Sequence, residues 1–178
     1  KRELTDYITE NTTSVWRIDD WSNYNALIQS QYATNASNES SEISKLLSHL
    51  QPSKTSLITA ISSDSTNSYT LITPQDSLLL PTDTTQYKIH KEKELIKYTN
   101  KDYSFYAGVS DSIVLVGTNE ALLERMLSDG SPTNDKLKQL LNVKSKSDIV
   151  GLRKNTEQSG LAEWSVLDFS LIESGFLA

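Results

Sequence analysis

The stretch VGTNEALLE at 116–124 has the layout of a phosphate-binding turn, because an apolar run, a glycine and the start of an amphipathic helix follow one another. A dinucleotide fingerprint needs three spaced glycines, and a P-loop needs Gly-Lys-Ser/Thr where the helix begins. Gly117 stands alone, no lysine follows it, and Glu120 would repel a phosphate. Thr118 or Asn119 suits a helix N-cap instead. The pattern favours a corner of the fold over a ligand site.

Adjacent carboxylates at Asp19 and Asp20 are the strongest candidates for acid–base chemistry, because they follow the end of an expected strand. The alternative, which we favour, is that they cap a helix. His49 and His90 form no HxH or HxxxH spacing, so zinc is not predicted. Neither GxSxG nor SxxK occurs. We therefore expect no catalytic residue, no metal site and no cofactor.

Aromatic side chains are the other candidate source of binding chemistry, since they are frequent hot spots in protein interfaces. The residues that we predict to bind a partner or ligand are Trp21, Tyr24, Tyr103 and Tyr106. All four lie in expected strands or helices. The alternative interpretation is therefore that they belong to the core.

Composition excludes several classes of function. The chain has 178 residues, a net charge of −6 and a pI near 4.9. Lysine and arginine are dispersed, and acids interleave with the basic run at 88–97, so nucleic-acid binding is not expected. The absence of cysteine removes disulfides, thiolate metal sites and thiol chemistry. A surface rich in serine, threonine and asparagine is typical of exported proteins.

Hydrophobic spacing predicts strands and helices in separate runs. Alternating or apolar β-branched segments indicate strands at 13–19, 55–62, 68–74, 87–99 (two strands and a turn), 103–111, 112–118, 147–154 and 162–172. Amphipathic spacing indicates helices that begin at 21, 41, 119 and 134. Segregated runs of this kind predict an α+β domain, an antiparallel sheet with pairs of short amphipathic helices packed on one face.

One α+β domain over 1–178 is the expected organisation. A strand–helix–helix–strand unit occurs at 13–62 and again at 112–152, which allows an internal duplication with units 6–102 and 103–178. The alternative is that two helical hairpins on one sheet look alike. The chain opens KRELTDYI without a starting methionine or an apolar leader, so we expect a piece of a longer protein, with any lipid anchor upstream.

Two passages resemble a loose group of bacterial extracytoplasmic proteins of unknown function, found notably in Bacteroidetes. They are DYITENTTSVWRIDDWSNYNAL at 6–27 and YSFYAGVSDSIVLVGTNEALLERML at 103–127. Thr9 stands where the group usually has proline. The resemblance implies an ectodomain of an envelope lipoprotein, and it supplies no catalytic residues.

These observations predict a non-enzymatic, extracytoplasmic structural or protein-binding domain of a bacterial envelope lipoprotein, in the periplasm or at the outer-membrane surface. An accessory subunit of an outer-membrane complex is one such role. Its partners would be other envelope proteins or further domains of the same chain, and membrane contact would come only through an anchor outside this segment. The alternatives are a carbohydrate- or peptide-binding module that uses the aromatic residues and, least favoured, a hydrolase.

Overall fold

A computed structural model describes residues 2–29, 39–63, 66–128, 132–143, 147–155, 164–172 and 175–177. The strands are β1 (Ser14–Ile18), β2 (Ser56–Ser63), β3 (Thr66–Pro74), β4 (Lys88–Glu92), β5 (Leu95–Asn100), β6 (Tyr103–Ser110), β7 (Ile113–Gly117), β8 (Ile149–Lys154), β9 (Trp164–Ile172) and β10 (Gly175–Leu177). The helices are α1 (Trp21–Gln29), α2 (Glu39–His49), α3 (Glu120–Leu127) and α4 (Asp135–Val143), with short 3-10 turns η1 (Leu4–Tyr7) and η2 (Gln75–Ser77).

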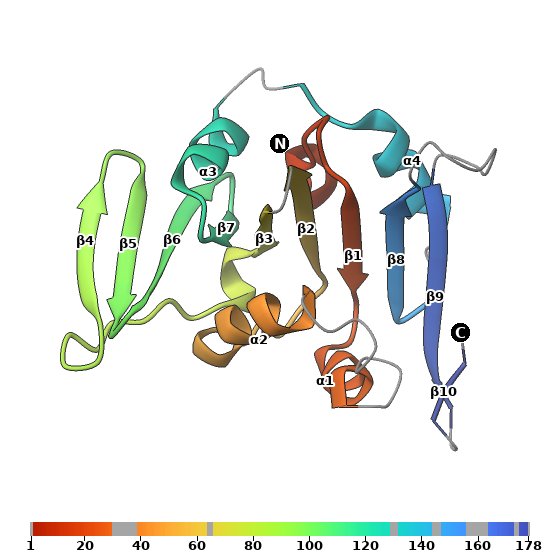
Figure 1. Ribbon diagram of the computed structural model, residues 1–178, viewed down its shortest axis with the longest axis horizontal. Helices are drawn as coiled ribbons and strands as arrows, with labels where there is room; N and C mark the ends of the chain where they lie inside the picture. Colours follow the sequence, from red (N-terminus) through yellow and green to blue (C-terminus); the bar gives the residue numbers. More distant parts are fainter. Residues whose placement is uncertain are drawn as a thin grey trace.

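In the described part of the chain, ten strands form one sheet in the order β10-β9-β8-β1-β2-β3-β7-β6-β5-β4, and every pair is antiparallel (Figure 1). Two pairings on either side of the central β2–β3 hairpin join distant parts of the chain. Thr70 on β3 faces Gly117 on β7, and Val15 on β1 faces Leu152 on β8. The α+β class and the antiparallel sheet predicted from the sequence are confirmed.

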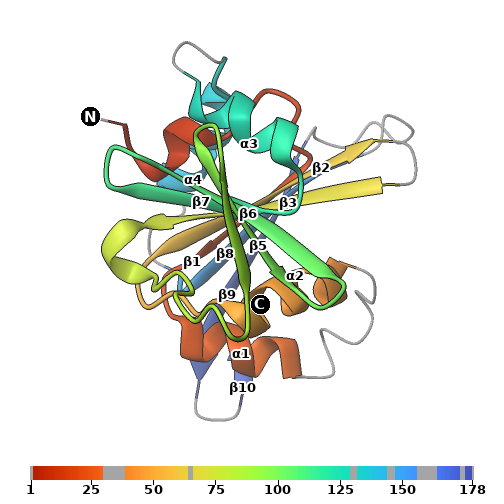
Figure 2. The same ribbon diagram turned by 90° about the vertical axis from the view of Figure 1, so that its left-hand side faces the viewer.

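Helices cover both faces of the sheet, which corrects the expectation that they pack on one face. Figure 2 shows α1 and α2 on one side, and α3, α4 and η1 on the other. Two cores result. The first lies under α1 and α2 and contains Ile43 and Leu46; the second lies under α3 and α4 and contains Leu123 and Leu137.

Side-chain alternation explains why both faces need a cover. On β7, Val114 and Val116 enter the first core, whereas Ile113 and Leu115 enter the second. All five residues of this strand are buried. An uninterrupted apolar run such as IVLV is typical of a strand that is covered on both faces. This run was the sequence signal for helices on both sides.

The two strand–helix–helix–strand units close differently in the sheet. In the first, β1 and β2 flank α1 and α2 and pair directly with each other. In the second, β7 and β8 flank α3 and α4 but are separated in the sheet by β3, β2 and β1. Among the described residues, no helix is long and apolar enough to cross a membrane.

Candidate functional site

The VGTNEALLE stretch forms a packed corner. Asn119 is the N-cap of α3, and its side-chain oxygen accepts a hydrogen bond from the Leu122 N–H at 3.1 Å. A Cβ atom at Gly117 would lie 2.8 Å from the backbone oxygen of Tyr69 on the neighbouring strand. The glycine is needed because two backbones approach closely, which confirms the interpretation as a corner.

Two of the four predicted binding residues lie in the first core. Trp21 is 6% exposed and Tyr24 is 5% exposed, and their rings meet edge to face at 5.2 Å. The Trp21 indole N–H donates to the Lys54 carbonyl at 3.0 Å. Burial raises the pKa of the Tyr24 hydroxyl well above its usual range. Both residues are therefore core residues, as the alternative interpretation predicted.

Tyr103 and Tyr106 point to opposite faces of the sheet because they are three residues apart on one strand. Tyr103 packs against the first core, and Tyr106 packs against the second. The Lys97 ammonium lies 5.7 Å from the centre of the Tyr106 ring. The four predicted aromatic residues are therefore not brought together into one binding face.

A cluster of rings under α2 went unrecognised in the sequence. His49 stacks on Tyr103 with 5.1 Å between ring centres, and Tyr98 stacks on Phe105 at the same distance. Tyr87 meets His49, Tyr98 and Phe105 edge to face. His49, at the end of α2, is half-buried in this cluster. No local spacing indicates this cluster, because its members come from α2, β5, β6 and the segment before β4.

Asp19 and Asp20 lie at an open hollow of about 580 Å³ between the start of α1 and the Gln51–Ser53 segment. The carboxylate of Asp20 accepts hydrogen bonds from the Ser22 and Asn23 N–H groups, at 2.9 and 3.2 Å. Asp19 forms an ion pair with Arg17 at 3.4 Å. Both carboxylates therefore have structural roles, and the capping role predicted for this pair is confirmed for Asp20.

Histidine and acidic side chains do not converge in the described residues. No group of three or more His, Cys, Asp or Glu side chains there is arranged to hold a metal ion. His90 is exposed on β4, with Nε2 at 3.8 Å from the Glu92 carboxylate.

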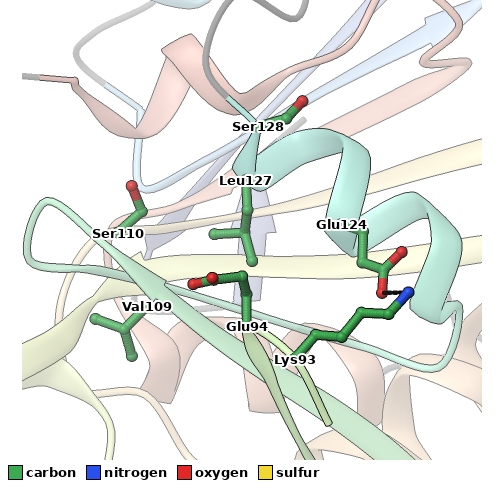
Figure 3. Close-up of a pocket in the computed structure, with 7 residues that line it drawn as sticks. All are labelled: Lys93, Glu94, Val109, Ser110, Glu124, Leu127 and Ser128. Carbon is green, nitrogen blue, oxygen red and sulfur yellow. Dashed lines mark ion pairs between the residues drawn. The ribbon is translucent and has the colours of Figure 1, made fainter.

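A groove of about 470 Å³ lies between the β4–β5 turn, the end of β6 and the C-terminal half of α3 (Figure 3). We call it the α3 groove, and it is lined by Lys93, Glu94, Val109, Ser110, Glu124, Leu127 and Ser128. Gly108 positions its apolar wall, because a Cβ there would lie 2.4 Å from the Leu127 Cδ1 atom. The absence of a side chain at Gly108 therefore allows α3 to pack closely against β6.

The α3 groove combines apolar and charged surface. Val109 is 48% exposed, although valine is among the residue types that are most often buried. The Glu124 Oε1 atom is buried and accepts no hydrogen bond, and the Lys93 ammonium lies 3.7 Å from it. Ser128 is engaged elsewhere, since its hydroxyl donates to the Arg125 carbonyl at 2.8 Å. The groove thus offers a binding partner an apolar contact beside the Lys93–Glu124 ion pair.

Comparison with known proteins supports the fold. Two crystal structures of TP0453, a lipoprotein of the outer membrane or periplasm of Treponema pallidum, are similar to this chain. One superposes with a TM-score of 0.51 at 8% identity and the other with 0.54 at 9%; each match covers 99% of this chain and 78% of TP0453. The comparisons with protein-family models and with curated protein sequences gave no match.

Proposed function

We propose that this chain is a non-enzymatic, extracytoplasmic protein-binding domain of a bacterial envelope lipoprotein, and that a partner protein docks in the α3 groove. The observation that carries the proposal is the exposed Val109 beside Leu127 and the Lys93–Glu124 ion pair. Apolar side chains next to a few placed polar groups are what a protein-binding pocket needs.

The chemistry of the candidate residues supports a binding role over catalysis. The α3 groove has two serines but no histidine to activate them. Asp20 is occupied as a helix cap, and Asp19 is paired with Arg17. Neither carboxylate stands beside a serine–histidine pair in the lining of its hollow.

Three observations support the proposed compartment. The fold is shared with an envelope lipoprotein, TP0453. The chain lacks cysteine and is rich in hydroxyl and amide side chains. The two passages at 6–27 and 103–127 resemble bacterial ectodomains. In this proposal a lipid anchor elsewhere in the protein holds the domain at the membrane, where further envelope proteins are its partners.

Affinity capture with matched variants tests the docking site. The tagged chain is cross-linked in cells of its source organism, and captured proteins are quantified for wild type, Val109→Glu and Leu79→Glu. Leu79 is 93% exposed and lies outside the groove, so its variant controls for a new charge on an exposed apolar residue. We expect a stoichiometric partner with wild type and Leu79→Glu, and its loss with Val109→Glu.

Two outcomes would contradict the proposal: the absence of any stoichiometric partner, or equal capture by Val109→Glu, with circular dichroism confirming that the variant is folded. A titration with oligosaccharides separates the carbohydrate-binding alternative. Because Trp21 is buried and Trp16 and Trp164 pack against the two cores, we expect no change of tryptophan fluorescence on adding sugars.

A further inference from the structure

β4 ends the sheet, and all of its residues are exposed or half-buried (Figure 1). No described strand pairs with its outer edge. Such an edge presents unpaired backbone N–H and C=O groups, which can pair with another strand. From the charge pattern of β4 we infer that its partner is β4 of a second copy, so that two sheets join across a twofold axis.

The register with β5 fixes which side chains share a face. Glu92 lies opposite Leu95, which belongs to the second core, so Lys88, His90 and Glu92 are on the face that α3 and α4 cover further along the sheet. Ile89 lies opposite Tyr98 of the first core, so Ile89 and Lys91 occupy the other face.

Symmetry limits how two copies of β4 can meet. A twofold axis that joins two strands antiparallel stands perpendicular to the sheet, so each face continues into the same face of the partner. A residue on the axis therefore lies opposite its own copy. Within β4 the axis can pass through Ile89, His90 or Lys91. Only the axis at His90 pairs all five residues.

The axis at His90 is also the one that satisfies the charges. It places Lys88 of each copy opposite Glu92 of the other, which gives two directly opposed pairs of opposite charge. Ile89, which is 37% exposed, then lies opposite the Lys91 aliphatic chain of the second copy. An axis at Lys91 would oppose two lysines, and an axis at Ile89 would oppose Lys88 to His90. The strand is therefore self-complementary in one register.

Charge reversal tests this register. Sedimentation velocity on the full chain over a wide range of concentration measures the association of wild type, Lys88→Glu, Glu92→Lys and the double variant. A five-residue edge is short, so we expect a weak, concentration-dependent dimer. Each single variant places like charges opposite each other twice. Its association should therefore be weaker than that of wild type by a factor of about ten or more. The double variant exchanges the partners of each pair and should recover the wild-type association.

A mixture of the two single variants is the most discriminating measurement. Lys88→Glu opposed to Glu92→Lys restores both pairs of opposite charge, so the mixture should form a heterodimer that neither variant forms alone. Lys91→Glu is the matched control, because it reverses a charge on the same strand but, in the proposed register, lies opposite Ile89 of the second copy. It should leave association almost unchanged.

Three results would overturn the inference: a wild-type chain that stays monomeric, a dimer that the single variants leave unaltered, or single variants that the mixture does not rescue. The first would mean that the charges of β4 only protect the edge from pairing. All substituted side chains are exposed or half-buried, so the fold should be retained, which circular dichroism checks. The test does not depend on the α3 groove.

Discussion

The Nδ1 atom of His49 lies 2.6 Å from the hydroxyl oxygen of Tyr87, and this hydrogen bond joins α2 to the segment that enters β4. The two residues are 38 positions apart in the sequence. His49 also stacks on Tyr103, so one histidine holds the end of α2 against the first core. We interpret the contact as a structural link, because the His49 Nδ1 atom and the Tyr87 hydroxyl are hydrogen-bonded to each other inside the fold.

Removing either partner of this hydrogen bond should destabilise the protein. We expect His49→Leu and Tyr87→Phe each to lower the free energy of unfolding by about 1 kcal/mol. The double variant should lose less than the sum, because both changes remove the same interaction. Urea unfolding at low protein concentration measures all three, with His90→Gln as an exposed-histidine control that should change stability by less than about 0.5 kcal/mol. Strictly additive losses would show that the contact contributes nothing.

Buried tyrosines should make the protein sensitive to alkali. Burial, with the nearby Glu42 carboxylate, raises the pKa of Tyr103 from 10.0 to about 12. Between those values the unfolded chain loses a proton that the native state keeps, so stability falls as pH rises. Tyr103→Phe should flatten this decline, as measured by denaturant unfolding at a series of pH values.

Near neutral pH the same variant should be neutral or slightly stabilising, because the Tyr103 hydroxyl is buried without a hydrogen bond. The decline that remains in alkali belongs to other tyrosines such as Tyr98, whose pKa is also raised by burial. A wild-type protein whose stability is constant from pH 10 to 12 would contradict this prediction.

Two glycines should respond differently to alanine. The new Cβ at Gly117 meets a backbone oxygen of β3 at 2.8 Å, and we expect Gly117→Ala to cost about 2 kcal/mol or more. The Cβ at Gly108 meets the ends of the Leu127 and Leu95 side chains, which can shift more easily than backbone, so Gly108→Ala should cost less. Thermal unfolding of both variants compares them. If Gly108→Ala were the more destabilising variant, the β3 and β7 backbones would move apart at a lower energetic cost than a shift of the Leu127 and Leu95 side chains.

Tight turns of the β4–β7 meander hold ordinary residues in the left-handed region. Lys101 has φ 54°, as does Lys93, and Asp111 and Ser112 also have positive φ. Such a conformation costs about 1 kcal/mol for a residue with a Cβ. We expect Lys101→Gly to raise the free energy of unfolding by about 0.5–1 kcal/mol. Asp102→Gly, in the same turn at negative φ, should instead lower it, and equal effects of the two variants would argue against strain.

Local signals in the sequence predicted most individual elements. The leucine spacing and the Asn119 cap indicated the helix that the structure has at Glu120–Leu127. The strands expected at 13–19 and 147–154 correspond to Ser14–Ile18 and Ile149–Lys154. These predictions succeed because hydrogen-bonding caps and the periods of helix and strand act over a few neighbouring residues.

The candidate site depended on contacts that no local pattern reveals. The α3 groove brings together Val109, Glu124 and the turn at Lys93, and it forms where α3 packs against β6 at Gly108. The aromatic residues singled out from the sequence were dispersed, since burial of Trp21 and Tyr24 depends on what packs above them. Residue type alone cannot distinguish an aromatic anchor on a surface from one in a core.

The sequence by itself determined the fold class of this protein. The spacing of its apolar residues and its helix caps already indicated an α+β fold with short helices between strands, and the absence of cysteine excluded disulfides. Tertiary structure decided the rest. Sheet order is set by long-range pairings such as β1 with β8, and the burial of IVLV on both faces decides where the helices pack. Backbone hydrogen bonds between strands are the same for every residue type, so their partners are chosen only when the whole core assembles.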